Sequence, residues 1–210
     1  MERLLHNKTT RFGLIRHAQT VWNREKKIQG CSDSPLTPEG ELQASHWGKI
    51  LDQFLWNRLL ASDTGRALAT AEIIKAYLKI PLTADPRLRE QDWGSWVGKT
   101  IAQLKAEQPM VLAKQISAGW DFRPPGGEDR KSVLARSQRA LQEAFDRWPG
   151  ENILVVTHEG VIKSLVYHLS GRKFLPTEPP LLKSYQLHRL LHDRDGLRLE
   201  AANALALAAT

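Results

Sequence analysis

Residues 12–20 read F-G-L-I-R-H-A-Q-T, an apolar run that stops abruptly at Arg16 and His17. A short apolar run bounded by polar residues is typical of a buried strand. The residues that follow, up to position 38, are mostly polar and are punctuated by glycine and proline, as in a loop. The segment therefore predicts a buried strand that ends on an arginine and a histidine.

Strands and helices alternate along the rest of the chain. Residues 152–157, N-I-L-V-V-T, are the clearest buried strand and end just before His158. The spacing of apolar residues predicts another strand at 59–62, helices from 37–38 onward and at 64–79, about 129–148 and 161–169, and an antiparallel pair at 185–191 and 197–207. This alternation predicts an α/β fold, a three-layer α/β/α sandwich with a mainly parallel central sheet.

Periodicity weakens between residues 81 and 128, a stretch that holds three tryptophans and several glycines and prolines. One helix is expected there, at about 101–114. We expect about 85–127 to form a small insertion, packed over the edge of the sheet, within a single domain that spans 1–210.

The charge balance is basic, with 30 Lys and Arg against 23 Asp and Glu and a formal net charge of +7. The positive residues are scattered, no aromatic–basic pattern of an RNA-binding sheet is present, and one cysteine cannot build a zinc finger. Nucleic acid is therefore not the expected partner. A solvated basic surface explains the charge, and a field that attracts phosphorylated substrates is the second interpretation.

Cys31 is the only cysteine, so no internal disulfide can form and a reducing compartment is expected. No apolar run has the length of a membrane helix, and residues 1–11 lack a signal-peptide core. We expect a cytoplasmic protein without membrane association. Cys31 is expected to be at least semi-buried, and several histidines to lie on helix or strand surfaces without a role: His46, His168, His188 and His192.

Three predicted strand ends carry side chains capable of chemistry. In open α/β sheets, ligands gather beyond the carboxyl ends of the strands. The pattern alone therefore brings two histidines and two arginines into one crevice: Arg16, His17, Arg66 and His158.

This set of side chains fits the transfer of a phosphoryl group. The planar fork of arginine matches phosphate oxygens, and neutral imidazole is a competent nucleophile. A leaving alkoxide also needs a proton from a carboxylic acid, for which Glu90 is the candidate. Taken singly, each residue is explained as a surface charge or a structural histidine, so the joint placement carries the hypothesis.

Four ordered blocks of sequence extend this pattern. They are 14–40, with L-I-R-H-A-Q-T, W-N, Q-G and P-L-T; 62–71, S-D-T-G-R-A-L-A-T-A; 88–98; and 155–160, V-V-T-H-E-G, with P-G-G-E at 125–128 between the last two. Together they resemble the histidine phosphatase superfamily, also called the phosphoglycerate mutase-like family. The resemblance implies that family's fold, with the insertion as a lid over the active site.

The resemblance also implies roles. His17 would be the nucleophile that is phosphorylated and then regenerated by water, and Glu90 would protonate the leaving oxygen and then deprotonate the water. Phosphoryl oxygens would be bound by Arg16, Asn23, Arg66, His158 and the backbone N–H of Glu159. No metal or cofactor is expected, because arginine and histidine supply the positive charge.

Two positions depart from the family pattern. Ala18 stands where glycine is usual, which is a mild change if its φ is negative. Glu159 stands where a small residue is common, and its carboxylate opposes dianion binding unless it faces away.

Three functions remain open from the sequence. A phosphatase is favoured over a cofactor-dependent phosphoglycerate mutase, because mutases carry paired arginines before a proline run, whereas Phe122-Arg123-Pro124-Pro125 has one. A non-catalytic phosphate- or phosphoprotein-binding module is the third hypothesis. The expected substrate is a small phosphorylated metabolite. Its pocket would be built from residues 93–127, with four aromatic side chains: Trp93, Trp96, Trp120 and Phe122. Whether the protein forms a homodimer is left open by the sequence.

Overall fold

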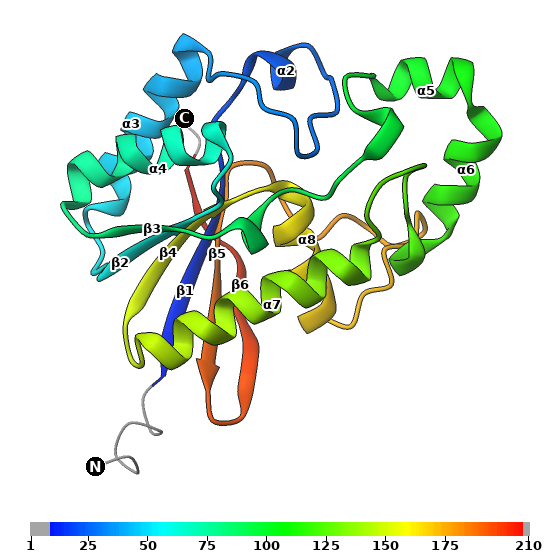
Figure 1. The fold of residues 1–210 in the computed structure, drawn as a ribbon. Helices are drawn as coiled ribbons and strands as arrows, with labels where there is room; N and C mark the ends of the chain where they lie inside the picture. The colour runs from blue at the N-terminus through cyan, green and yellow to red at the C-terminus, as the bar shows by residue number, and fades with distance from the viewer. Residues whose placement is uncertain (1–8, 208–210) are drawn as a thin grey trace.

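The computed structural model describes residues 9–207. Within them one six-stranded sheet has the order β3-β2-β4-β1-β5-β6 (Figure 1). Its first four strands in that order run parallel, and the last two are antiparallel to their neighbours. The strands are β1 (Thr10–Arg16), β2 (Arg58–Ala61), β3 (Leu82–Ala84), β4 (Asn152–Thr157), β5 (Gln186–Asp193) and β6 (Gly196–Ala206).

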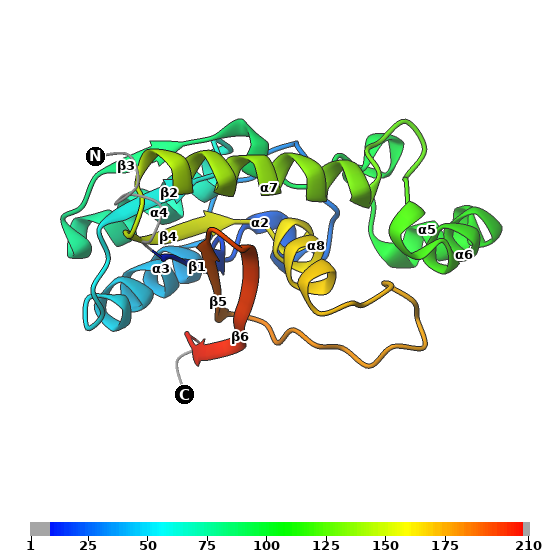
Figure 2. The same ribbon diagram turned by 90° about the horizontal axis from the view of Figure 1, so that it is seen from below.

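Helices cover both faces of the sheet, and the side chains of β4 show why. Ile153 and Val155 point into one core, and Leu154 and Val156 into another. A strand buried on both faces reads as a continuous apolar run. The first core is closed by α7 (Arg130–Arg147) and α8 (Glu159–Leu169), and the second by α3 (Pro38–Leu51) and α4 (Gly65–Leu78) (Figure 2). The predicted three-layer sandwich with a mainly parallel sheet is confirmed.

Residues 85–127 connect β3 to α7 through short elements. These are 3₁₀ turns η1 (Pro86–Leu88), η2 (Gly94–Trp96) and η3 (Gly119–Asp121) with helices α5 (Ile101–Glu107) and α6 (Pro109–Ser117). The segment has a small apolar cluster of its own, made of Trp96, Leu104, Leu112 and Phe122. Figure 2 shows α5 and α6 projecting beyond the end of the sheet.

The prediction of one helix at 101–114 was wrong, because the chain breaks at Gln108. Proline at 109 has no N–H to continue the helix and restricts the residue before it. Gln108 accordingly has φ −139° and ψ 49°, outside the helical region. The short helix α2 (Val21–Arg24) and strand β3 were not predicted, since neither has an apolar periodicity of its own.

Three side chains are buried or exposed contrary to expectation. Cys31 is exposed. His188 and His192 are buried within β5, where His192 stacks on Phe145 of α7 and His188 accepts a hydrogen bond from the N–H of Asn203.

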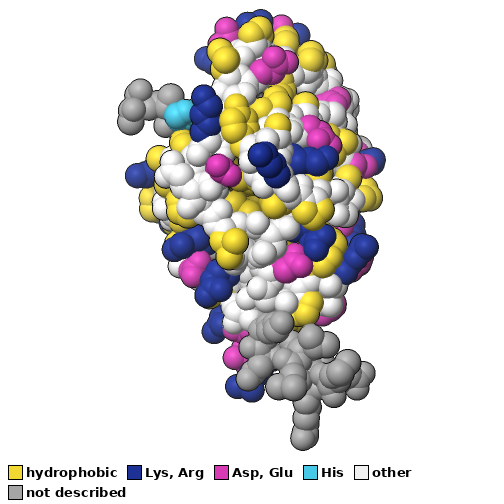
Figure 3. Space-filling model, turned by 90° about the vertical axis from the view of Figure 1, so that its left-hand side faces the viewer, with side chains coloured by type: hydrophobic (Ala, Val, Ile, Leu, Met, Phe, Trp, Pro, Cys, Tyr) yellow, Lys and Arg dark blue, Asp and Glu magenta, His cyan; other side chains and the backbone are white. Residues whose placement is uncertain are grey.

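The charged surface agrees with the scattered pattern of the sequence. On the face shown in Figure 3, Lys and Arg side chains are interspersed with Asp and Glu. Among residues 9–207, no helix has both the length and the apolar character needed to cross a membrane.

Candidate active site

The site lies where three parallel strands end. β1 ends at Arg16 and leads into His17, and β4 leads into His158, which is the N-cap of α8. Arg66 lies in the first turn of α4, just after β2. The rings of His17 and His158 are 5.2 Å apart between centroids. The predicted convergence of the two histidines with Arg66 is therefore present.

The hydrogen bonds of His17 define its tautomer. Nδ1 lies 2.8 Å from the carbonyl oxygen of Ala18, which can only accept, so Nδ1 carries the proton. Nε2 then has the lone pair and accepts from Nε of Arg66 at 3.3 Å. Burial, and then the charges of Arg16 and Arg66, hold the pKa of His17 well below its usual 6.5. The imidazole is therefore neutral near pH 7, with Nε2 available to attack.

Arg66 is held rigidly beside that lone pair. Its side chain is 1% exposed. Nη1 donates to the carbonyl of Ser32 at 2.7 Å and to Asp33 at 3.2 Å, and Nη2 donates to the carbonyl of Gly30 at 2.8 Å. The loop after β1 thus fixes the guanidinium without leaving it fully neutralised, because the partly exposed Asp33 is its only carboxylate partner within 4 Å among residues 9–207.

His158 lies behind Arg66. Its Nδ1 accepts from Nη2 of Arg66 at 3.2 Å, so its Nε2 is the protonated nitrogen and donates to Ser62 Oγ at 2.9 Å. Burial, and then His17 and Arg66, hold the pKa of His158 well below 6.5. It is fully buried and does not line the cavity in front of His17.

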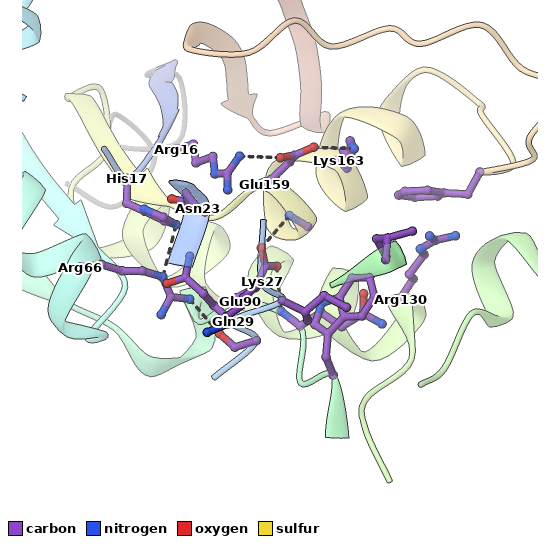
Figure 4. A pocket seen from close by; sticks show the side chains of 17 residues that line it. Arg16, His17, Asn23, Lys27, Gln29, Arg66, Glu90, Arg130, Glu159 and Lys163 are labelled. Atoms are coloured by element: carbon purple, nitrogen blue, oxygen red, sulfur yellow. Dashed lines mark hydrogen bonds and ion pairs between the residues drawn. The ribbon is translucent and has the colours of Figure 1, made fainter. Parts of the chain in front are cut away.

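Arg16 enters the cavity from the other side of His17, paired with Glu159. Its Nη1 is 2.7 Å from Glu159 Oε2, and Glu159 Oε1 is 2.6 Å from Nζ of Lys163. Burial raises the pKa of Glu159, but Arg16 and Lys163 outweigh that effect and hold it below its usual range. The extra carboxylate noted in the sequence lines the cavity rather than facing away, and it is balanced by these two cations (Figure 4).

Glu90 lines the same cavity as His17. Its two carboxylate oxygens accept from the N–H of Gln91 at 2.8 Å and the N–H of Gly160 at 3.1 Å. The carboxylate thus bridges the insertion and the first turn of α8. A Cβ at position 160 would come within 2.3 Å of Glu90 Oε1, so the approach depends on glycine.

Asn23 and Ala18 occupy the loop around the nucleophile. Asn23 lines the cavity, and its Oδ1 accepts from the N–H of Thr20 at 3.1 Å. This bond fixes which end of the side-chain amide is the oxygen, so the NH₂ group is the end that remains available as a donor. Ala18 is fully buried and is not among the residues with positive φ, so the replacement of glycine is tolerated.

The cavity in front of His17 measures about 340 Å³. Of the aromatic residues expected to line it, Trp93 does, whereas Trp96 and Phe122 lie in the apolar cluster beneath and Trp120 packs against Phe174. Sequence reasoning gave no role to several lining residues, which belong to the loop after β1, to α5, α7 and α8, and to the connection after α8: Lys27, Ile28, Gln29, Ile101, Arg130, Lys163 and Phe174. Only Ile101 among them falls within the predicted range 93–127. Within residues 9–207, no group of three or more His, Cys, Asp or Glu side chains is arranged to hold a metal ion.

The chain matches the histidine phosphatase superfamily (branch 1) over residues 12–205. The chain belongs to this superfamily. A Salmonella choleraesuis (strain SC-B67) relative named "Probable phosphoglycerate mutase GpmB" is 36% identical to it over 158 residues, which are 75% of this chain and 74% of that protein.

Solved structures of related proteins have the same fold as this chain. Bacillus stearothermophilus YhfR is 32% identical, with a TM-score of 0.85 over 94% of this chain and 98% of that one. A mycobacterial glucosyl-3-phosphoglycerate phosphatase, solved with VO3, is 29% identical, with a TM-score of 0.80 over 93% of this chain and 99% of that one. Relatives of this chain therefore include a phosphatase and a protein named as a mutase.

Proposed function

We propose that this chain hydrolyses phosphomonoesters through a phosphohistidine intermediate on His17, with Glu90 as proton donor. The observation that carries the proposal is the neutral imidazole of His17, with its Nδ1 proton held by the Ala18 carbonyl and its Nε2 lone pair beside a rigid arginine. A buried lone pair next to a fixed cation is suited to attack on a phosphorus atom, because the cation stabilises the charge that develops on the phosphoryl oxygens.

The reaction has two displacements. In the first, Nε2 of His17 bonds to phosphorus, the bond from phosphorus to the ester oxygen breaks, and Glu90 gives its proton to the leaving oxygen. In the second, Glu90 takes a proton from water, the water oxygen bonds to phosphorus and the P–N bond breaks. Arg16 and Arg66 stabilise the charge on the phosphoryl oxygens, and the amide of Asn23 and the backbone N–H of Glu159 are further donors in this proposal.

His158 acts through Arg66 in this scheme. It accepts from Nη2 of Arg66 and borders the ring of His17, but it is absent from the cavity lining. Direct binding of phosphate by His158, which the family resemblance implies, would need Arg66 to shift toward a ligand.

A phosphoglycerate mutase is the second candidate, because a relative that is 36% identical over 158 residues is named "Probable phosphoglycerate mutase GpmB". Mutases have paired arginines where this chain has only Arg123. Its side chain donates to the Gly127 carbonyl and is not part of the cavity lining. A mutase would form a stable phosphoenzyme with a bisphosphoglycerate and release little phosphate, whereas a phosphatase releases phosphate continuously.

The proposed role of Glu90 is tested by Glu90→Gln on two substrates that differ in their leaving group. An alkyl phosphate needs protonation of its leaving oxygen, so we expect kcat/KM to fall by about 10²–10⁴-fold, while a nitrophenyl phosphate loses much less. Glu107→Gln, which removes a surface carboxylate paired with Lys99, is the matched control. Equal losses on both substrates would show that Glu90 is not the proton donor.

A further inference from the structure

One cation of the cavity has no carboxylate partner. Five lysine or arginine side chains line the cavity, and four of them pair with an acid within 4 Å. The fifth is Arg130, for which residues 9–207 provide no ion pair. Figure 4 places Arg130 at the end of the cavity away from His17 and Arg66.

The guanidinium of Arg130 lies between two aromatic rings. Its Cζ is 4.2 Å from the ring centroid of Phe122 and 4.3 Å from that of Phe174. Nη1 donates to the carbonyl of Gly119 at 2.7 Å. A guanidinium has five N–H donors, so most of this one's donors have no acceptor within the described chain.

The surroundings of Arg130 hold it in place. Phe174 packs against Trp120 at 4.7 Å and Tyr167 at 4.5 Å between ring centroids, and it has a φ of +61°, which is unfavourable for a bulky residue. Strained backbone persists where the surrounding structure enforces it, often at ligand sites. The aromatic rings thus fix the plane of the guanidinium at the cavity wall.

A partly desolvated cation without a partner is costly in a folded protein. Burial lowers the pKa of Arg130 to about 10, and no neighbouring carboxylate compensates. A structural arginine that only stacked on rings would gain from an acidic partner as well. The open donors and their position on the cavity wall indicate that the missing partner is a ligand.

We propose that the substrate carries a second anionic group, a carboxylate or a second phosphate, and that Arg130 binds this group while the phosphoryl group to be transferred lies at His17. This inference rests on the proposed function, which it refines to a class of substrate. Besides its polar side chains, the cavity wall includes the apolar side chains of Ile28, Trp93 and Ile101. The substrate is therefore a compact molecule with an anion at each end.

The test uses matched pairs of phosphomonoesters of increasing chain length, ω-carboxyalkyl, ω-phosphoalkyl and ω-hydroxyalkyl phosphates. The wild type is expected to prefer one of the two anionic series over the neutral one by about 10- to 100-fold in kcat/KM, the range of a charge-assisted hydrogen-bonded pair. The better anionic series identifies the terminal group. No preference at any length would overturn the proposal.

Arg130→Met keeps the apolar contact with the two rings and removes the charge. It is expected to erase the preference while leaving kcat/KM for the hydroxyalkyl series within about threefold. Lys131→Met removes the neighbouring charge, which pairs with Asp121 on the surface, and should change neither series. A loss that is equal for charged and neutral substrates would mean that Arg130 only supports the fold, and the proposal would fail.

Binding separates this inference from the proposed function. The corresponding non-hydrolysable phosphonates are titrated calorimetrically against the wild type and Arg130→Met. If no substrate is turned over, the proposed function fails, yet tighter binding of a carboxyl or phosphoryl phosphonate that depends on Arg130 still supports the subsite. If turnover is present but the phosphonates bind equally with and without the terminal anion, the subsite is wrong and the phosphatase proposal stands.

Discussion

A nucleophilic imidazole needs a lone pair on its attacking nitrogen, and the carbonyl of Ala18 leaves one on Nε2 of His17 by holding the proton on Nδ1. The site residues that could be predicted from the sequence were those at strand ends, because a parallel sheet brings the carboxyl ends of its strands together independently of loop conformation. Arg130 could not be found in this way. At the start of a predicted helix its charge is expected to be solvated, and the tertiary contacts with Phe122 and Phe174 shield it only partly from water.

Gly160→Ala tests the position of Glu90 without removing its carboxylate. The new Cβ would lie 2.3 Å from Glu90 Oε1, the flexible end of a side chain, so the carboxylate must move while the helix remains intact. We expect kcat on an alkyl phosphate to fall by about 10- to 100-fold, with a change in melting temperature of only a few degrees.

The control for Gly160→Ala is the double variant with Glu90→Gln. If the glycine acts through Glu90, the double variant is no slower than Glu90→Gln alone. Losses that multiply would contradict this explanation.

At the scale of elements, α7 positions the segment that carries Glu90. Arg136 in α7 donates to the carbonyls of Arg87, Arg89 and Glu90 at 2.6–3.0 Å and pairs with Glu128 at 2.8 Å. The sequence predicted α7 from its apolar spacing, but a side chain that ties a helix to backbone carbonyls leaves no periodic signal. Strand β3 was missed because it has no apolar periodicity of its own, whereas the break between α5 and α6 was missed although Pro109 marks it in the sequence.

Arg136→Met removes these bonds and leaves three carbonyls and a carboxylate without their donor. We expect the free energy of unfolding to fall by about 2–3 kcal/mol and kcat to fall with it, because the Glu90 segment loses its anchor. Denaturant unfolding and steady-state kinetics measure the two effects. Arg139→Met, an exposed position on the same helix, is the control and should leave both unchanged.

At the scale of the whole molecule, the fold class could be predicted but the strand order could not. Alternating strands and helices identify a mainly parallel sheet, whereas the insertion of β4 between β2 and β1 depends on long-range pairing. The closing strands β5 and β6 were predicted as a pair, but their histidines were expected at the surface and His188 and His192 are buried.

Buried neutral histidines make the stability of the fold depend on pH. Burial lowers the pKa of His188 from 6.5 to about 4, and the pKa values of His17 and His158 are also lowered by burial. Below pH 6.5 the unfolded chain binds protons that the folded chain does not, so the free energy of unfolding falls as pH falls toward 4. Each such histidine contributes a slope of at most about 1.4 kcal/mol per pH unit.

Urea unfolding between pH 7.5 and 4.5 measures this dependence. His188→Gln, which keeps an acceptor for the N–H of Asn203, is expected to make the curve shallower, and His46→Gln at an exposed position is not. An unchanged slope in His188→Gln would show that His188 is not buried in its neutral form.

The most direct test of the central claim is the fate of the phosphoryl group on His17. Release of phosphate from an aryl phosphate is measured in excess chelator for the wild type and His17→Ala, and the phosphoenzyme is trapped by rapid quenching and mapped. We predict turnover that persists in chelator, an acid-labile phosphoryl group on His17, and loss of both in His17→Ala. Turnover that survives in His17→Ala, or a phosphoryl group on another residue, would contradict the account.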